Sequence, residues 1–525
     1  MSKWKIAIFF VLLVFLGCQS SGQKSSSAKI VKINLGSEPH TLDPRRARDP
    51  NSQILMRMFF EGLTRIGPSD QPELALALSV EISEDLKTYV FTLRDAQWSN
   101  GEPIRAQDFA YAWKRMLSPD FPCDNAFQLY LIKNGKQVKE GTLTIDELGV
   151  LTPDEKTLIL ELEYPTPYIL ELMATPYFFP VHQQTDENQP RWSEKQESYV
   201  SNGPFLFKEW KHNDQITAEK NLTYWDADAV QIELLVLTMV DSDTEMKLFE
   251  KNELDWTGSP LSVIPVDAIT HLKDKLYVKP KDETAFLRTN IEVCPLDHPK
   301  MRKALALAIN RKLIVEHVTQ GGQLPAQRLI PPSMQLQKEP YFSDGAIEEA
   351  KKLFMEALAE LEVDFPNIKL TYINSERSHL IVQAIQQQWF EAFGVRIGLE
   401  AIERKVYFDR ISKQDYDLAF CSWGADFHDP VNFLEVFKYK TQSTNNTHWE
   451  DAEYTKGLND SFRLLDPAER LQLLAHCEKL LMDAMPIIPI FHYTMLYMKN
   501  DQLDGVFLSS MGNLDFKWAK LKNDK

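Results

Sequence analysis

Residues 426–429, Asp-Phe-His-Asp, place two carboxylates and one imidazole close together and are the nearest approach to a metal-binding cluster in the chain. Three potential ligands within four residues rarely complete a metal site alone, so we expect no metal there and no cofactor. The patterns H-E-x-x-H, G-x-S-x-G, the P-loop pattern and a G-x-G-x-x-G after a strand do not occur. Catalytic triads are built from residues distant in sequence, so this search does not exclude an enzyme, but it gives no positive evidence for one.

Cys18 is the other residue whose surroundings indicate chemistry, in this case covalent lipidation. A head with two lysines precedes an unbroken apolar run over residues 6–16, which is too short to span a bilayer and is typical of an export signal. Residues 15–18, Phe-Leu-Gly-Cys, resemble the bacterial lipobox, with phenylalanine where lipoproteins usually carry leucine. The alternative is an ordinary secretory signal with an incidental cysteine. We expect residues 1–18 to be a lipoprotein signal peptide ending at lipidated Cys18, and residues 19–28 to be a flexible tether.

Size and charge limit the classes of protein that remain. The 525 residues are 44% hydrophobic and 25% charged, which is ordinary globular composition, and a chain of this length forms two or three domains. The 58 basic and 75 acidic side chains give a formal net charge of −17, which argues against nucleic acid and anionic lipid surfaces as partners. Four further cysteines are widely spaced. Export permits disulfides, but the sequence does not choose between two bridges, one and none.

Strand and helix patterns alternate along the chain, which indicates an α/β protein. The predicted strands are residues 29–35, 80–82, 89–93, 157–162, 205–207, 368–373, 395–401, 417–421 and 487–493. The predicted helices are residues 54–62, 106–117 (with Asp108 as its N-cap), 299–318 (with a break near Asn310), 346–361, 381–393 and 466–482.

Four stretches carry motifs in a fixed order. Residues 74–113 contain a hairpin that leads into Arg-Asp-Ala-Gln-Trp-Ser-Asn-Gly-Glu-Pro-Ile and a helix entry, and residues 202–225 begin Asn-Gly-Pro-Phe and end Tyr-Trp. Residues 297–311 begin Asp-His-Pro and end Asn-Arg, and residues 422–430 read Ser-Trp-Gly-Ala-Asp-Phe-His-Asp-Pro. Together they resemble the extracytoplasmic solute-binding proteins of family 5, the oligopeptide- and dipeptide-binding proteins of ABC transporters. The resemblance covers roughly residues 29–518.

This resemblance implies a fold and a domain division. The fold would be an α/β type II periplasmic-binding-protein fold in its large three-domain form, with a ligand cleft between two lobes. Domain I would combine residues 29–60, 199–286 and 494–525, domain II would be residues 61–198, and domain III would be residues 287–493. The lobes would close about a hinge near residues 286 and 493.

The resemblance also implies a ligand site in residues 422–430. In the oligopeptide binders, the aspartate that matches Asp426 pairs with the α-ammonium of the peptide, and the neighbouring tryptophan-containing segment pairs with the peptide as a strand. Carried over to this chain, Trp423, Gly424 and Ala425 supply the backbone edge, Asp426 binds the ammonium, and His428 is a further ligand contact. The alternative for Asp426 is a loop-capping role. Main-chain hydrogen bonds and one carboxylate suit a carrier that must ignore side chains.

The implied function is that of a lipid-anchored substrate-binding component of a peptide ABC importer, not an enzyme. We expect a monomer in the periplasm or cell envelope, with short peptides, permease subunits and, through its lipid, a membrane as partners. Two departures concern the ligand. Residues 419–422 are Ala-Phe-Cys-Ser, without the cation that the best-known oligopeptide binders carry shortly before the tryptophan, and no motif marks a cation for the peptide's C-terminal carboxylate. Ligand length and C-terminal preference are therefore open. Two alternatives therefore stay open: the same fold with a cell-wall (murein) peptide, nickel chelate, haem or sugar as ligand, and an extracytoplasmic hydrolase.

Overall fold

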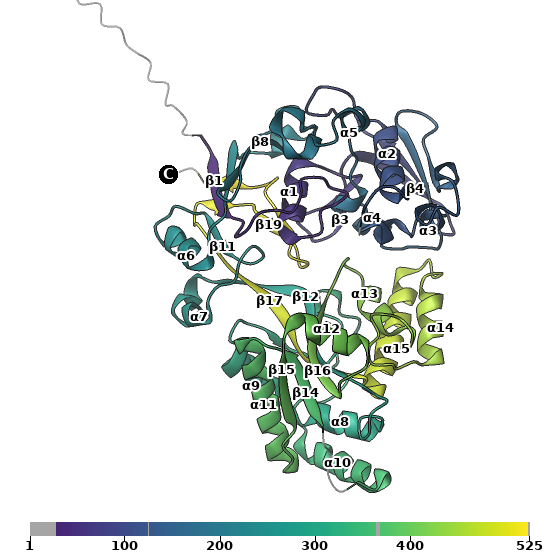
Figure 1. Ribbon diagram of the computed structural model, residues 1–525, viewed down its shortest axis with the longest axis vertical. Coiled ribbons are helices and arrows are strands. Elements are labelled where there is room, and N and C mark those ends of the chain that lie inside the picture. The colour runs from purple at the N-terminus through teal and green to yellow at the C-terminus, as the bar shows by residue number, and fades with distance from the viewer. Residues whose placement is uncertain (1–27, 124, 364–367, 523–525) are drawn as a thin grey trace, which may run out of the picture.

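The computed structural model describes residues 28–522 apart from residue 124 and residues 364–367. Cys18, the predicted signal peptide and nearly all of the predicted tether lie outside the described residues. Figure 1 shows two lobes, one above the other, joined by two long strands. None of the helices described here combines the length and the apolar character needed to cross a membrane.

The upper lobe surrounds one hydrophobic core whose buried members lie within residues 31–256 and 495–519. One of its sheets has the strand order β1-β10-β9-β8, and a second, antiparallel sheet has the order β4-β5-β7-β6. Its elements are β1 (Ile30–Asn34), α1 (Pro50–Phe59), β2 (Thr64–Ile66), β3 (Pro72–Leu74), β4 (Ala77–Ile82), β5 (Thr88–Leu93), α2 (Ala106–Leu117), α3 (Gly135–Lys139), β6 (Val150–Leu151), β7 (Thr157–Glu161), α4 (Ile169–Leu172), α5 (Gln183–Asn188), β8 (Phe205–Lys211), β9 (Gln215–Lys220) and β10 (Leu234–Thr238).

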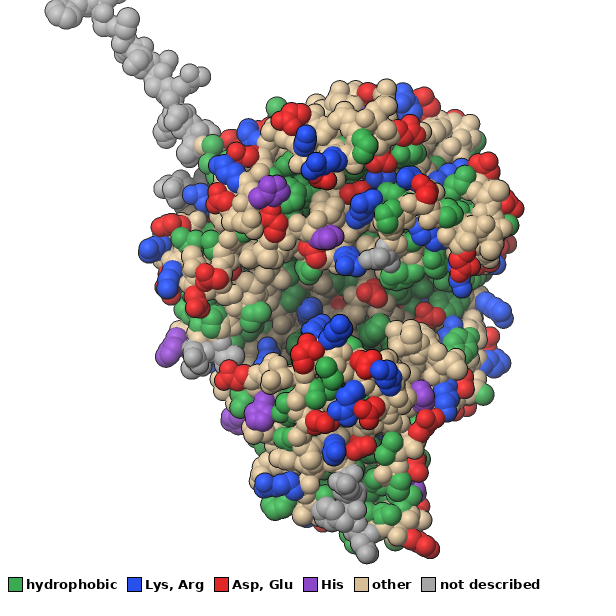
Figure 2. Space-filling model, in the orientation of Figure 1, with side chains coloured by type: hydrophobic (Ala, Val, Ile, Leu, Met, Phe, Trp, Pro, Cys, Tyr) green, Lys and Arg blue, Asp and Glu red, His purple; other side chains and the backbone are tan. Residues whose placement is uncertain are grey.

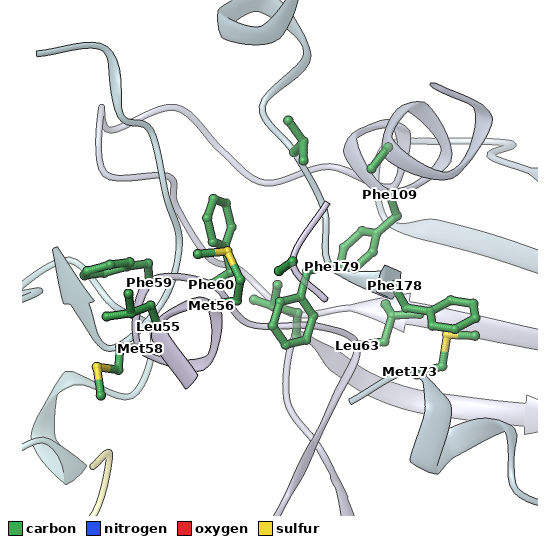
Figure 3. Packing of buried hydrophobic residues seen from close by; sticks show 14 of the residues in the cluster. Leu55, Met56, Met58, Phe59, Phe60, Leu63, Phe109, Met173, Phe178 and Phe179 are labelled. Carbon is green, nitrogen blue, oxygen red and sulfur yellow. The ribbon is translucent and has the colours of Figure 1, made fainter. Parts of the chain in front are cut away.

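Helix α1 packs one side against this core (Figure 3). Leu55, Met56, Met58 and Phe59 point from α1 into a cluster that also receives Phe178 and other aromatic and sulfur-containing side chains. The helix begins four residues before the predicted start, because the Asp49 side chain accepts a hydrogen bond from the Ser52 amide and Pro50 occupies the first turn. It ends at Phe59 instead of residue 62, since the next residue is already extended.

The lower lobe surrounds a second core whose buried members lie within residues 285–491. Its sheet has the order β11-β17-β12-β16-β14-β15, with β13 paired to β17. Its helices are α8 (Pro299–Leu307), α9 (Arg311–Ile314), α10 (Ile347–Leu361), α11 (Glu376–Phe393), α12 (Arg404–Ser412), α13 (Val431–Leu434), α14 (Ala452–Ser461) and α15 (Pro467–Ala484). Its strands are β12 (Tyr277–Thr289), β13 (Leu324–Pro325), β14 (Lys369–Ile373), β15 (Gly398–Ile402), β16 (Leu418–Gly424) and β17 (Ile487–Lys499).

Strands β12 and β17 form an antiparallel pair that runs from one lobe to the other (Figure 1). The pairing shifts register between Pro280 and Thr284, so Asp282 lies where the ladder is interrupted. Helices α6 (Ser242–Glu250) and α7 (Val266–Leu272) and strand β11 (Trp256–Gly258) lie beside this crossing. The chain then returns to the upper lobe through β18 (Leu503–Asp504), β19 (Phe507–Leu508), β20 (Leu514–Asp515) and β21 (Lys520–Leu521).

Two local predictions need comment. The helix predicted over residues 299–318 is broken near Asn310 as expected, because the Asn310 side chain caps α9 by accepting from the Leu313 amide. Asp108 is not the N-cap of α2: that position is Arg105, and the Asp108 carboxylate accepts from the Arg105 amide and from Trp98 Nε1. The four described cysteines are free thiols.

A buried ion pair ties the returning C-terminal segment to the upper lobe. Arg65 donates to the Glu61 carboxylate and, at 2.8 Å, from its Nε to Asp515 Oδ2, and all three residues are buried. Replacing Arg65 with alanine leaves two buried carboxylates uncompensated, so we expect the free energy of unfolding to fall by ~3–5 kcal/mol in urea titrations. Lys479→Ala, which breaks an exposed pair with Asp483, is the control and should change little. Equal losses in both variants would contradict the role of Arg65.

Candidate ligand-binding site

The predicted ligand segment begins in β16, one edge of which is only partly covered. Strand β16 pairs with β12 along its whole length, from Leu418 opposite Thr289 to Gly424 opposite Glu283. On its other side it pairs with β14 only at Leu418 and Ala419. From residue 420 onward, no further strand of the described chain covers that edge. The Phe420 carbonyl accepts from the Tyr407 hydroxyl at 3.0 Å, so the main chain open to an extended ligand begins after Phe420.

The residues after β16 form a loop, residues 425–429, which we call the ligand loop. Asn432 holds its start, because its side-chain oxygen accepts from Trp423 Nε1 at 3.0 Å and from the Asp426 amide at 3.3 Å. The Ala425 amide donates to the Asp282 carbonyl at 2.8 Å. A Cβ at Gly424 would make only an ordinary contact, 3.7 Å from Glu283 Cγ, so the packing of the chain itself does not require glycine there.

The end of the ligand loop is fixed by a buried ion pair. Asp429 accepts from both terminal nitrogens of Arg470, each at 2.8 Å, and also from the Val431 amide. The three side chains considered above as metal ligands therefore do not converge. Asp429 binds Arg470, His428 binds Asp282, and Asp426 bonds to neither Arg470 nor Asp282.

Asp426 is exposed and has no ion-pair partner in the described part of the chain. Desolvation by the protein around it raises the pKa of its carboxyl, and a hydrogen bond with the Asn432 side chain lowers it by less. The charge of Asp426 also reaches Tyr177 in the upper lobe, whose hydroxyl accepts a hydrogen bond from Gln53 at 2.9 Å. The acid thus lies on the lower lobe and faces polar groups of the upper lobe.

His428 is placed beside a buried carboxylate. Its Nδ1 lies 2.7 Å from Asp282 Oδ2, and the same carboxylate accepts from the hydroxyls of Ser333 and Ser510. Burial alone would lower the pKa of His428, but the hydrogen bond and charge of Asp282 outweigh it and raise the pKa. The imidazole is therefore already engaged within the protein, and its contact with a ligand stays a prediction.

Several residues at this site carried no sequence signal. Tyr168, beside α4, stacks on Phe427 of the ligand loop with ring centroids 4.1 Å apart and planes at 8°. Arg377, near the start of α11, acts electrostatically on Tyr493, which hydrogen-bonds Ser422 of β16. Such residues become neighbours of the ligand loop only through the folded arrangement, and no local spacing marks them.

A cavity also lies between the two lobes, beside the segment that precedes Tyr168 in the chain. Its volume is about 1390 Å³, and it is lined by Tyr164 and Lys87 from the upper lobe and by Lys438 and Phe462 from the lower lobe. The rings of Tyr164 and Phe462 meet edge to face across it, with centroids 6.2 Å apart. Figure 2 shows the recess between the two lobes on one face of the molecule.

Comparison with known proteins places this architecture in a family. The family described as "Bacterial extracellular solute-binding proteins, family 5 Middle" matches residues 71–445. The oligopeptide-binding protein OppA of Bacillus subtilis (strain 168) is 39% identical over 99% of this chain and 99% of its own length. The chain belongs to family 5 of the bacterial extracellular solute-binding proteins. This confirms the family resemblance, the α/β class and the periplasmic-binding-protein fold predicted from the sequence.

Two solved structures of family 5 proteins differ in how well they match. The periplasmic murein tripeptide binding protein MppA in its unliganded open form has a TM-score of 0.86, 26% identity, and coverage of 94% of this chain and 98% of its own. Listeria monocytogenes OppA bound to peptide has a TM-score of 0.71 and 27% identity, with coverage of 95% and 100%. Similar identity and coverage with unequal scores indicate that the lobes here are arranged more like the open form.

Because His428 pairs with Asp282, removing the Asp282 carboxylate should change the pKa of the His428 imidazole. Because the folded-state pKa of His428 is raised, the pair's contribution to stability is complete below about pH 6.5 and is lost as the pH rises through the raised pKa. In Asp282→Asn, the largest groups that raise the pKa of His428 are lost while burial still lowers it, so this pKa should be lower than in the wild type. NMR titration of the imidazole, assigned with His428→Gln, measures this. An unchanged pKa in Asp282→Asn would show that Asp282 is not the cause.

Proposed function

We propose that this protein is the substrate-binding component of a peptide ABC importer and captures short peptides in extended form. The observation that carries the proposal is Asp426, an exposed carboxylate that faces the upper lobe and has no ion-pair partner among the described residues. A carboxylate that a ligand covers is stabilised by a paired charge, and the α-ammonium is the one positive charge that unmodified peptides share. The relatives support this, since one is named an oligopeptide-binding protein and another is described with a bound peptide.

The neighbouring strand edge suits the rest of such a ligand. Trp423, Gly424 and Ala425 are proposed to offer their main chain to the peptide, and His428 to lie beside its first residue. Main-chain pairing is independent of side-chain identity, so it gives affinity for many sequences. The partial cover of β16 from residue 420 onward supports this role. Arg377 gives this region a positive charge, of the sign that a C-terminal carboxylate requires.

The domain division is proposed as it was predicted, with domain I as residues 29–60, 199–286 and 494–525, domain II as 61–198 and domain III as 287–493. Two separate hydrophobic cores and the two strands that cross between them support a division that lets the lobes close about the crossing. Closure over a ligand would then create the face that permease subunits recognise.

The remaining parts of the proposal concern location and chemistry. We propose that the protein works outside the cytoplasm as a monomer, anchored to a membrane by lipid on Cys18, and makes or breaks no bond. The lipobox-like sequence before Cys18 and the binding-protein family support these points. Cell-wall peptides remain within this ligand class, whereas the relatives give no support to a nickel, haem or sugar ligand.

Removing the charge of Asp426 should weaken peptide binding. For Asp426→Asn we expect a loss of ~2–5 kcal/mol for a synthetic pool of peptides of three to ten residues, as for truncation of one partner in a buried charge pair. Tryptophan fluorescence titration measures it. The same pool with N-acetylated termini is the matched control. It should bind wild type weakly and should not discriminate between wild type and Asp426→Asn. Equal wild-type affinity for both pools would remove Asp426 from ammonium recognition.

Peptide binding should also make the whole molecule more compact, because the cleft between the lobes closes. Small-angle scattering of the wild type should show a smaller radius of gyration with the free-amine pool than without it, because a ligand between the lobes favours closure. The acetylated pool at the same concentration is the control. A scattering curve that stays the same with the bound pool would contradict ligand-driven closure.

A further inference from the structure

Two aromatic side chains connect the lobes at the ligand loop. Among the described residues, Tyr168 and Phe427 are the two partly buried side chains that pack against both hydrophobic cores. Tyr168 belongs to the upper lobe, and Phe427 follows Asp426 directly in the lower lobe. Their parallel stack, with centroids 4.1 Å apart, therefore contacts the residue next to the proposed ligand acid from the opposite lobe.

A polar contact lies beside this stack. Glu171 of α4, three residues after Tyr168, is 6% exposed, and the His428 amide donates a hydrogen bond to its carboxylate. Its carboxylate oxygen Oε1 is buried without a hydrogen-bond partner in the described part of the chain. The upper lobe thus holds the residues on both sides of the Phe427–His428 peptide bond, once through a ring and once through a carboxylate.

The charges around Glu171 make its ionisation unfavourable. Burial raises its pKa to about 7, the hydrogen bond and charge of His428 lower it, and the carboxylates of Asp70 and Asp282 raise it further. Lys279 also faces this group of acids, but its Nζ lies 3.2 Å from Asp70 and so serves that carboxylate. Near neutral pH, Glu171 therefore changes between its neutral and charged forms.

We propose that Tyr168 and Glu171 are positioning residues for Asp426. Together they hold the ligand loop from the upper lobe, so that the Asp426 carboxylate meets a ligand in a fixed place. The effect on peptide binding rests on the proposed function, whereas the positioning of the ligand loop does not. Preorganisation raises affinity because less freedom is lost when the ligand binds. Freeing the loop should weaken binding without removing the carboxylate that does the binding.

The ionisation of Glu171 should make the contact between α4 and the ligand loop depend on pH. The raised pKa belongs to the buried arrangement, and an exposed glutamate would return to about 4.5. Ionisation above about pH 7 therefore favours separation of α4 from the ligand loop, whereas the neutral form favours contact. Asp426 acts in the other direction, since its protonation at low pH removes the charge that the ligand needs. We expect peptide affinity to pass through a maximum and to decline on both sides of it.

The aromatic contact is tested with three variants. Tyr168→Ala should raise the half-saturating concentration of the free-amine peptide pool about tenfold, whereas Tyr168→Phe keeps the ring and should bind like wild type. Tyr164→Ala is the matched control, because it removes the other aromatic contact across the lobes without touching the ligand loop. Equal weakening by Tyr164→Ala, or no weakening by Tyr168→Ala, would overturn the proposal.

Glu171→Gln tests the polar contact through a pH profile. Glutamine cannot ionise, so the part of the loss of affinity near pH 7 that Glu171 causes should disappear, while the part from the titration of His428 and the decline at low pH from Asp426 should remain. The titration of the peptide ammonium at higher pH is common to both proteins and does not interfere with the comparison. A wild-type profile unchanged by Glu171→Gln would show that Glu171 does not position the ligand loop.

A measurement without ligand separates this inference from the proposed function. In ligand-free Tyr168→Ala, amide hydrogen exchange over residues 425–429 should be faster than in wild type and in Tyr164→Ala, because the loop has lost its support. Unaltered exchange would refute positioning even if peptides bind. Faster exchange in a protein that binds no peptide would uphold positioning and refute the peptide-carrier function.

Discussion

The arrangement around Asp426 depends on one electrostatic constraint. Asp426 has no ion-pair partner among the described residues, and the surrounding protein displaces part of the water that stabilises its charge, although the side chain stays exposed. The chain meets this constraint by fixing the backbone on both sides: Asn432 and the Asp282 carbonyl hold the start of the ligand loop, and the Asp429–Arg470 pair holds its end. The loop therefore keeps its shape without the carboxylate of Asp426, which is left available for a charge from outside.

Asp282 performs a second task at the crossing between the lobes. It lies in the register shift of the β12–β17 pair, where a regular ladder would have used its main-chain groups for pairing with β17. Its carboxylate instead receives donors from three separate segments: Ser333 of the lower lobe, Ser510 of the returning C-terminal segment and His428 of the ligand loop. The irregular pairing thus brings the crossing strands, both lobes and the ligand loop to one carboxylate, so movement of the lobes and movement of the loop are not independent.

The sequence predicted the fold well wherever local spacing determines structure. The hairpin of β4 and β5, helix α2 and the break at Asn310 follow from alternation, apolar periodicity and capping chemistry, and each was found where it was predicted. Helix α1 was misplaced because its start depends on Asp49, whose capping hydrogen bond was not considered, while the apolar run alone suggested a later start. Family motifs identified the architecture, whereas the ligand contacts that they predict in residues 422–430 stay a prediction. Tyr168, Glu171 and Asp282 could not be predicted, because their roles arise from contacts between segments more than 100 residues apart in the chain.

Placing the acid and its polar neighbours on opposite lobes has a thermodynamic consequence. A ligand shifts an equilibrium between two arrangements only by the difference between its interactions in each. If an ammonium met Asp426 alone, its binding energy would be the same in the open and closed arrangements, and closure would not follow. Asp426 acts electrostatically on Tyr177 of the upper lobe, whose hydroxyl accepts from Gln53, so under the proposed function a ligand held by the acid would gain contacts with this pair as the cleft narrows. Capture on one lobe and closure of the other are therefore coupled through the ligand itself, while the Tyr168–Phe427 stack keeps the acid in place in the open arrangement.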